Sequence, residues 1–370
     1  MLPKEIKINI KKDDVNVSKM RRDLFFQPEF NPSSYYRKIH FSRYYYALII
    51  LRHYIKAVSD YYFSSIGAKN IDLFMLTNSV SSPTGPGSDS KPINIKLGKL
   101  KIFLVDSSQF GFEPLLSEKM KKLYCYLPSM RGENPDRRHL NQFFHCEMEM
   151  IGKLNELTPL IENYVKILCE TLLSMPHVID RISDNPTKTK LMLNRTIAQK
   201  EFPKICFDEA AKLLIERRRK GLLNMGKHGR NITAKGEIEL FKILKKEVPI
   251  WLTEFDRDIV PFYQKPARNK EKTINADLIF PPVTTGSFGG EIIGSGQRQD
   301  NAKEIYESLH RQKINCKNYN WYINIRRFND YKITSGFGMG IERFIAWALA
   351  KRNIRDVALY PRLKNVRMYP

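Results

Sequence analysis

The sequence has few cysteines and no long apolar run, and both absences narrow the possible classes of protein. Its five cysteines are scattered, with no C-x-x-C pair, as Cys125, Cys146, Cys169, Cys206 and Cys316. This spacing indicates neither a disulfide framework nor a zinc site, and it fits a reducing cytosol. The longest apolar stretch, Tyr44–Leu51, is far shorter than a membrane span, and the charged N-terminus lacks the apolar run of a signal peptide. We therefore expect a soluble, cytoplasmic protein without a membrane partner.

Acidic residues are also in deficit, because 39 Asp and Glu stand against 62 Lys and Arg and leave a net charge of +23. Such an excess is typical of proteins that bind nucleic acid. It is equally expected of a composition rich in Lys, Ile and Asn, in which the lysines are dispersed along the chain. Tight basic clusters are few, at Glu216–Arg230 (ERRRKGLLNMGKHGR) and Lys242–Glu247 (KILKKE). The charge alone leaves both interpretations open.

The hydrophobic pattern divides the chain into an irregular start and a long mixed region. Residues 1–39 are polar and lack a clear period, so they are predicted to be an irregular N-terminal extension. Apolar and aromatic residues recur at helical spacing from His40 to Ser65. The alternation in Ile93–Val105 predicts a hairpin that turns near Gly98. Residues 153–220 are predicted to be a mostly helical insertion.

Further strands and one helix complete the predicted fold. The strand patterns lie at Lys122–Met130, Phe143–Ile151, Lys272–Phe280 and Tyr319–Phe328, and the helical pattern at Gly340–Asn353. Strands that follow one another with hairpin-like links, mixed with helices elsewhere, favour an α+β fold on an antiparallel sheet.

Three segments combine arginines, carboxylates and glycines. Met130–Glu149 (MRGENPDRRHLNQFFHCEME) places charged side chains on two predicted strands and on the loop between them. Gly289–Gln299 (GGEIIGSGQRQ) and Ser335–Phe344 (SGFGMGIERF) are rich in glycine, which lets a backbone pass close to a ligand. Each segment alone is a weak signal. Together they supply the guanidinium groups and carboxylates that a triphosphate and its metal ions require.

These segments resemble motif 2, the run before motif 3, and motif 3 of the class II aminoacyl-tRNA synthetases. The sequences RGEN, RRHLNQF, EIIGSGQR, WYINIRRF, SGFGMGIER and NIRDVALYPR are most similar to the asparaginyl branch, with the aspartyl branch next. FPKICFDEA at Phe202–Ala210 is similar too, and the resemblance runs from Ser107 to Arg362. It implies a catalytic domain at residues 40–370 with an antiparallel sheet flanked by helices. It also implies an ATP-dependent ligase that uses Mg²⁺ and forms an aminoacyl-adenylate.

The resemblance implies the ATP site residue by residue. Arg131 would be catalytic at the α-phosphate, and Arg343 would be catalytic at the γ-phosphate. Phe143 would stack on the adenine, and Glu133 would accept a hydrogen bond from its amino group. The further ATP contacts that it implies are Arg138, His139, Glu291, Gly338 and Gly340, the glycines letting the backbone lie against the adenine. Asp277 matches a magnesium-binding carboxylate together with Glu291, although the link between them is longer than in the family.

The resemblance also implies an amino-acid site. Its residues are Ser107, Gln109, Glu147, Arg298, Thr334 and Gly336. Arg298 would bind the side-chain oxygen of the substrate. The aspartyl branch has a lysine where this chain has Phe112, so a second cation for a carboxylate substrate is missing. Glu147 would repel a carboxylate but accept from an amide, so an asparagine-like side chain is favoured.

Several positions depart from the family pattern. Thr334 stands where the family has a histidine, and Gln142 stands where it has a glutamate. Only Asp89 is offered for the glutamate that binds the α-amino group. Residues 1–39 do not alternate like the strands of the anticodon-binding barrel that precedes the asparaginyl core, so we expect a core without that domain.

The acceptor of the activated amino acid is therefore open. We expect transfer to a small amine or a carrier, with tRNA possible but not favoured. The alternatives are a compact asparaginyl- or aspartyl-tRNA ligase, an asparagine synthetase that uses aspartate and ammonia, and a non-catalytic regulator that binds an amino acid or RNA.

The aromatic helix at His40–Ser65 also bears on assembly. Its apolar residues cover more of its surface than one core-facing stripe needs. With the segment Leu73–Pro83 it corresponds to motif 1, through which cores of this family pair. We expect a symmetric homodimer.

Overall fold

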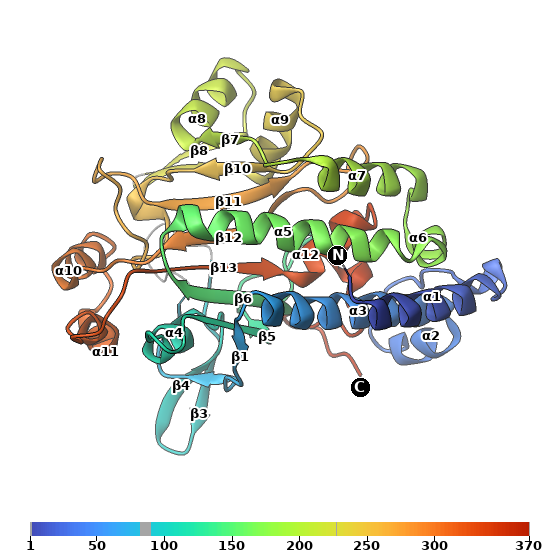
Figure 1. The fold of residues 1–370 in the computed structure, drawn as a ribbon, viewed down its shortest axis with the longest axis horizontal. Coiled ribbons are helices and arrows are strands. Elements are labelled where there is room, and N and C mark those ends of the chain that lie inside the picture. The colour runs from blue at the N-terminus through green and yellow to red at the C-terminus, as the bar shows by residue number, and fades with distance from the viewer. Residues whose placement is uncertain (1, 82–89, 227, 370) are drawn as a thin grey trace.

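The computed structural model describes residues 2–81, 90–226 and 228–369. Eight strands form one sheet in the order β1-β5-β6-β13-β12-β11-β10-β7 (Figure 1). The inner pairings are antiparallel, and the outermost pairs, β1–β5 and β7–β10, are parallel. The predicted α+β fold, an antiparallel sheet flanked by helices, is confirmed.

The strands have the following bounds. The large sheet contains β1 (Lys69–Asn70), β5 (Lys122–Met130), β6 (Gln142–Ile151), β7 (Lys204–Cys206), β10 (Ile250–Thr253), β11 (Asn275–Phe280), β12 (Gly290–Gln297) and β13 (Thr334–Gly340). A smaller sheet contains β2 (Leu76–Thr77), β3 (Asn94–Leu97) and β4 (Leu100–Leu104), and a separate hairpin contains β8 (Leu223–Gly226) and β9 (Gly229–Ile232). The predicted hairpin at Ile93–Val105 is confirmed, with Gly98 in its turn.

The helices are distributed along the whole chain. They are α1 (Lys4–Ser18), α2 (Tyr35–Phe41), α3 (Arg43–Ser65), α4 (Gln109–Phe112), α5 (Leu154–Leu173), α6 (Pro176–Ile182), α7 (Pro186–Ala198), α8 (Phe207–Glu216), α9 (Ala234–Leu244), α10 (Ala302–Arg311), α11 (Asn320–Ile325) and α12 (Ile341–Ala348). None of these helices, over the residues that the structure describes, is long and apolar enough to cross a bilayer.

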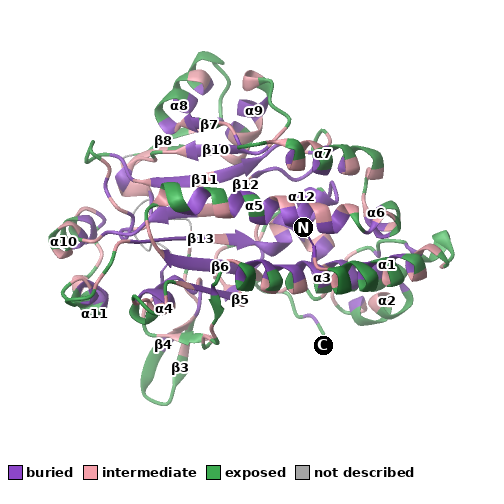
Figure 2. Ribbon diagram, in the orientation of Figure 1, coloured by how far each residue is buried: buried purple, intermediate pink, exposed green. Residues whose placement is uncertain are grey.

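The two faces of the large sheet have different roles. On β6, Cys146 and Met148 are fully buried in the main hydrophobic core, which also contains the inner sides of α3 and α5. Because side chains alternate along a strand, His145 and Glu147 point to the opposite face. Figure 2 shows the strands buried along most of their length, whereas the covering helices are exposed on their outer sides. One face therefore stabilises the fold, and the other carries polar groups.

The prediction of an irregular segment at residues 1–39 is wrong. Residues 4–18 form α1, whose Ile10 and Val17 belong to the same hydrophobic core as α3. Asp14 is buried and accepts from the backbone N–H of Val178 at 2.8 Å, which caps α6. The Ile, Val and Asn residues of α1 are poor helix formers, so tertiary contacts decide its structure.

The predicted strand at Tyr319–Phe328 is also wrong. This run forms a short 3₁₀ turn followed by α11. Its aromatic and aliphatic residues suggest a strand, but Tyr322 and Ile323 pack in a cluster with Phe110 and Phe262. Arg326 at the end of the helix forms a buried ion pair with Glu113 at 2.6 Å.

The predicted helical character of residues 153–220 is confirmed, since they contain α5, α6, α7 and α8. These helices are not set apart from the sheet. The ring of Tyr164 on α5 lies 6.1 Å from that of Phe337 on β13, and β7 pairs with β10 at the edge of the sheet. The segment is therefore part of the core.

Candidate active site

Two neighbouring cavities lie on the polar side of the sheet. All nine residues predicted for the ATP site line the first cavity: Arg131, Glu133, Arg138, His139, Phe143, Glu291, Gly338, Gly340 and Arg343. The second cavity is lined by four of the six residues predicted for the amino-acid site: Ser107, Gln109, Glu147 and Arg298. Segments far apart in the sequence thus form one composite site.

The two cavities share part of their walls. Arg131, His145, Glu291 and Gly338 line both of them. A ligand that filled both cavities would therefore pass between the Arg131 guanidinium and the Glu291 carboxylate. This junction is the place where charge that develops during a reaction would meet a fixed cation.

Hydrogen bonds fix the backbone of Arg131, while its guanidinium keeps an N–H donor without a protein partner in the described part of the chain. Its backbone N–H donates to the carbonyl of Asn141 at 3.0 Å, and the Asn141 amide donates back to the Arg131 carbonyl at 2.7 Å. The guanidinium lies 5.4 Å from the centre of the Phe143 ring. Its Nε is buried without a hydrogen-bond partner among the described residues. The side chain is thus placed at the junction with unused capacity to bind an anion.

Arg343 is anchored by its neighbour in the first turn of α12. Glu342 is buried, pairs with Arg52 of α3 at 2.7 Å and accepts from the backbone N–H of Phe144 at 2.8 Å. These contacts fix α12 against α3 and β6. Arg343 then reaches the Glu291 carboxylate at 3.2 Å on the wall of the first cavity.

Asp277 and Glu291 are brought together despite the long link between them. β11 and β12 pair in antiparallel register, with Asp277 opposite Gly294. A methyl group built on Gly294 would lie 3.6 Å from a carboxylate oxygen of each residue. Burial raises the pKa of Asp277, and the charge of Glu291 raises it further. Burial would also raise the pKa of Glu291, but Arg343, Arg138 and Arg131 lower it below its usual value.

This pair of carboxylates fits a divalent cation. Two carboxylates that face one position on a cavity wall repel each other, and a cation between them would allow both to be ionised. No cluster of three or more His, Cys, Asp or Glu side chains suited to a metal exists in the described part of the chain. A magnesium ion here would therefore complete its shell with phosphate oxygens and water, as it commonly does.

Arg138 and His139 line the first cavity, but each already has a protein partner. The Arg138 guanidinium donates to the carbonyl of Gly289, and burial lowers its pKa. His139 Nδ1 lies 2.8 Å from Asp136, and burial, followed by the charge of Arg343, lowers its pKa. Side chains that already have protein partners are less free to contact a phosphate than Arg131 is.

Glu237 of α9 is a residue of this site that sequence reasoning missed. Its Oε2 accepts from the backbone N–H of Glu291 at 3.1 Å and lies 3.8 Å from Nη2 of Arg138. Burial raises its pKa to about 7, with a smaller contribution from Glu291. No motif marks Glu237, because only the packing of α9 against the sheet brings it here.

Glu147 forms part of the wall of the second cavity. It is buried and accepts from Ser107 Oγ at 2.6 Å and from the Ser108 N–H at 2.5 Å. Nδ1 of His145 lies 3.3 Å from its Oε1. A carboxylate offers about four lone-pair positions, so further acceptor capacity remains.

Arg298 is held by Glu149, a second residue that sequence reasoning did not single out. Its Nη2 pairs with Glu149 at 2.9 Å, and the two side chains are 3% and 0% exposed. Gln109 completes the group, since its amide donates to Glu149 at 3.0 Å and its carbonyl accepts from Arg298. Nη1 of Arg298 has no hydrogen-bond partner among the described residues, so it can donate into the cavity.

Thr334 and Gly336 do not line the second cavity, so their contact with the amino acid stays a prediction. A methyl group on Gly336 would overlap the Glu149 carboxylate, which covers this glycine. The carbonyl of Thr334 accepts from the Arg298 N–H at 2.9 Å, and its hydroxyl is buried without a partner among the described residues. Both residues contact the Glu149–Arg298 pair, which in turn lines or supports the second cavity.

Two glycines of β13 also leave room for side chains of the neighbouring strand. Gly338 does line both cavities, but a methyl group there would lie 2.9 Å from Oε1 of Glu147. The absence of Cβ atoms at Gly336 and Gly338 accommodates carboxylates of β6 as well as a ligand. Phe112 is buried against Leu123 and Cys125 rather than on the cavity wall, and Asp89 lies outside the described residues.

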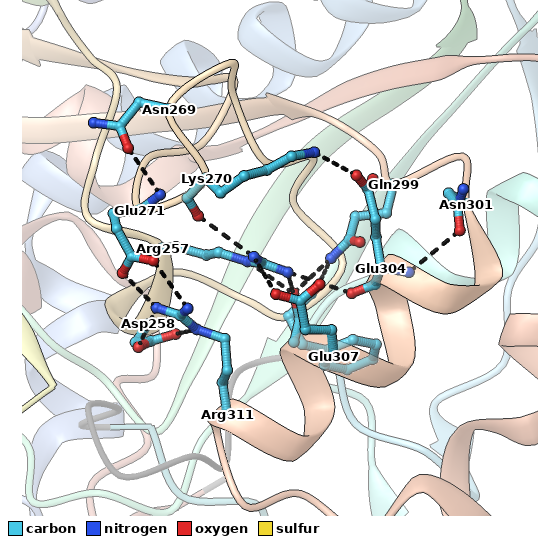
Figure 3. A network of polar contacts seen from close by, with 12 residues as sticks. Arg257, Asp258, Asn269, Lys270, Glu271, Gln299, Asn301, Glu304, Glu307 and Arg311 are labelled. Carbon is cyan, nitrogen blue, oxygen red and sulfur yellow. Dashed lines mark hydrogen bonds and ion pairs between the residues drawn. The ribbon is translucent and has the colours of Figure 1, made fainter.

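A polar network holds one wall of the second cavity in place. The loop that includes Val260, Tyr263 and Gln264 forms this wall. Figure 3 shows Arg257 between this loop and α10, where it donates to Ser308 Oγ at 2.9 Å and pairs with Glu307 at 3.1 Å. Arg311 of α10 binds Asp258 at 2.8 Å and Glu271 at 2.6 Å in the same view.

Comparisons with known proteins agree with this geometry. A family model described as tRNA synthetases class II (D, K and N) matches residues 28–364. A probable cytoplasmic asparagine–tRNA ligase of Encephalitozoon cuniculi is 30% identical over 268 residues, which are 70% of this chain and 56% of that protein. The asparagine–tRNA ligase of Mycoplasma pneumoniae is 25% identical over 87% of this chain and 70% of its own length. The chain thus spans between about half and 70% of these relatives.

A solved structure is similar over most of the chain. It is the asparaginyl-tRNA synthetase of Pyrococcus horikoshii complexed with asparaginyl-adenylate, with a TM-score of 0.79 and 25% identity. The similarity covers 91% of this chain and 72% of that one.

The environment of Glu237 predicts a pH-dependent stability effect. Its pKa in the folded state, about 7, exceeds the ordinary value of 4.5, so burial of its charged form destabilises the fold as pH rises above 4.5. Glu237→Gln should leave the free energy of unfolding nearly unchanged at pH 4.5 and raise it by about 3 kcal/mol at pH 8.

Urea denaturation at both pH values measures this effect. Glu239→Gln on the same helix is the matched control, because hydrogen bonding from Arg217 lowers the Glu239 pKa and the substitution should reduce stability at pH 8. Equal effects of Glu237→Gln at the two pH values would contradict the assigned environment.

Proposed function

This chain belongs to the class II tRNA synthetase family of the D, K and N group, and we propose that it is an ATP-dependent ligase that activates asparagine and transfers it to tRNA. The observation that carries the proposal is the junction at Arg131. There a cavity with the residues of a nucleotide site joins a cavity with the residues of an amino-acid site.

The first step would join the two substrates at this junction. The carboxylate of the amino acid attacks the α-phosphorus of ATP, a P–O bond forms, and the bond to the departing pyrophosphate breaks. The attacking carboxylate is already ionised, so no general base is needed. Arg131 would stabilise charge on the α-phosphate and Arg343 charge on the outer phosphates. Magnesium held by Asp277 and Glu291 would supply further neutralisation of the triphosphate.

The second cavity favours asparagine over aspartate. Nη1 of Arg298 is directed by the Glu149 pair and can donate to a side-chain carbonyl oxygen. Glu147 can accept from an amide N–H, whereas it would repel a second carboxylate. Among the described residues that line this cavity, Arg131 and Arg298 are the only arginines, and there is no lysine. An aspartate side chain would therefore be bound less well.

The relatives bear on the acceptor. Two proteins similar to this chain over long stretches are named asparagine–tRNA ligases, which favours tRNA over the small amine or carrier expected from the sequence. That earlier expectation stays an untested prediction. The set of Arg131, Glu291 and Arg343 around one cavity supports catalysis over a purely regulatory role, because a regulator does not require a triphosphate clamp.

Pyrophosphate exchange tests the first step. We expect purified protein with ATP and magnesium to exchange labelled pyrophosphate when asparagine is present, and to do so less well with aspartate. Arg131→Ala and Arg343→Ala should each reduce exchange by about 10²-fold, the usual effect of losing one charge-stabilising group. Arg22→Ala, which removes an exposed arginine outside both cavities, is the control. Full exchange in both variants would show that the ATP site is misassigned.

A charging assay with total tRNA then identifies the acceptor. Formation of asparaginyl-tRNA by the same preparation would support transfer to RNA. Exchange without charging, accompanied by new amide products when ammonia or simple amines are supplied, would favour the small-amine acceptor instead.

We also propose that the chain forms a homodimer through α3 and the described part of the segment 73–81. Apolar side chains are exposed on both elements: Phe74 is 88% exposed, Ile49 50% and Leu76 40%. Exposed apolar side chains that lie on a helix and on the segment that follows it are suited to burial against a second copy.

Phe74→Asp should therefore shift the protein to monomer, because a carboxylate would be buried in the interface without a partner. Sedimentation velocity at micromolar concentration measures the change. Met225→Asp, which replaces another exposed apolar side chain on β8, should remain dimeric. A monomeric unmodified protein under these conditions would refute the interface.

A further inference from the structure

A continuous basic surface surrounds α9, outside the two cavities. On one side of α9, a groove bounded by α7 and residues 281–286 is lined by Lys188, Arg195, Lys242, Lys245 and Lys246. On the other side, a second hollow is lined by Arg219, Lys220, Lys235 and, again, Lys242. The two hollows meet at Ile238 and Lys242. We call these eight cationic residues the α9 basic surface. Figure 1 shows the three helices α7, α8 and α9 in the upper part of the view.

The charge of this surface is poorly compensated. The hollows contain two carboxylates, and both are already paired: Glu239 with Arg217 at 2.9 Å, and Glu247 with Arg195. Five of the cations form no ion pair with any described residue: Lys188, Lys220, Lys235, Lys245 and Lys246. Like charges gathered in this way repel one another, and a polyanion on the surface would relieve that repulsion.

The floor of the larger groove is apolar. Leu191, Met192, Phe241 and Val283 line it together with two prolines of the link between β11 and β12. The groove has a volume of about 1420 Å³, which includes space open to solvent. A nucleic-acid strand presents anionic phosphates along one edge and less polar sugars and bases along the other. Cationic walls over an apolar floor are complementary to that combination.

The same chain segment also reaches the second cavity. Arg219 and Lys220 directly precede the β8–β9 hairpin, and α9 directly follows it. Asn231 of β9 lines the second cavity, and its neighbour Arg230 is fixed by an ion pair with Asp256 at 2.7 Å. A strand bound to the α9 basic surface could therefore extend along the hairpin and place its end at the site where an activated amino acid would lie.

We propose that the α9 basic surface binds the phosphodiester backbone of RNA whose end enters the second cavity. This proposal rests on RNA being the acceptor in the proposed function. The sequence did not indicate the surface, because its basic clusters at 216–230 and 242–247 are separated along the chain. The packing of α8 and α9 around Leu214 and Leu240 in one hydrophobic cluster brings them together.

Fluorescence anisotropy with a labelled single-stranded RNA, measured over a series of salt concentrations, tests the proposal. The test variant replaces Lys188, Lys242 and Lys246 by glutamine; all three are exposed. Each neutralised phosphate contributes about 0.7 to the slope of log K against log salt, so the slope should fall by about two. Affinity at ~0.1 M salt should fall by about 10²-fold.

The matched control replaces Lys4, Lys7 and Lys11 of α1 by glutamine, which changes the net charge equally on another part of the molecule. It should retain the affinity and slope of the unmodified protein. Equal losses in both variants, or no loss in either, would overturn the proposal. Competition by poly-glutamate as strong as that by RNA would also overturn it and indicate an acidic protein partner.

Pyrophosphate exchange without RNA is measured on the same preparations. If the unmodified protein shows no exchange but the lysine variants behave as expected, the proposed ligase fails while the RNA surface stands. If exchange occurs and the anisotropy result is negative, the surface fails alone.

Discussion

The site depends on a strand that lacks side chains at two positions. At Gly336 and Gly338, the backbone of β13 has no Cβ, and the carboxylates of Glu149 and Glu147 from the neighbouring strand lie over it. Glu149 lies over Gly336, where it can pair with Arg298. Glu147 lies over Gly338, where it forms part of the wall of the second cavity. The close packing of β6 against β13 thus brings three charged groups, Glu147, Glu149 and Arg298, to one site.

Electrostatics then distinguishes the groups that support the site from those available to a ligand. The Glu149–Arg298 pair is buried and joined by several hydrogen bonds, so removing either partner would leave an uncompensated buried charge. Arg131 has a buried Nε without a protein partner, and Asp277 has a raised pKa beside Glu291. These are the groups whose environment would improve when phosphates and a cation bind. These groups therefore favour a ligand that extends from one cavity into the other.

Many residues of the two cavities could be predicted from the sequence, because they lie in short motifs whose residue types and spacing are visible without the fold. The arginines, glycines and acidic residues of the three segments supply much of the walls of both cavities, and the strand patterns predicted β5 and β6. Glu149 lies within one of those segments, yet its role emerges only when Gly336 is seen to be covered by it. Glu237 and the α9 basic surface depend on how α9 packs, which no local pattern contains. The errors at α1 and α11 have a related cause, since tertiary packing there overrides weak local preferences.

The most direct test of this account is the affinity of a non-hydrolysable asparaginyl-adenylate analogue for Gly336→Ala, measured by calorimetry alongside the unmodified protein and with AMP as a second ligand. The added methyl group would overlap Glu149 and displace it from Arg298. We expect binding of the analogue to weaken by about 10²-fold, the scale expected when a positioned group is misplaced by about 1 Å, while AMP binding is retained. Undiminished affinity of the variant for the analogue would contradict the claim that the side-chain-free surface of β13 positions the amino-acid site.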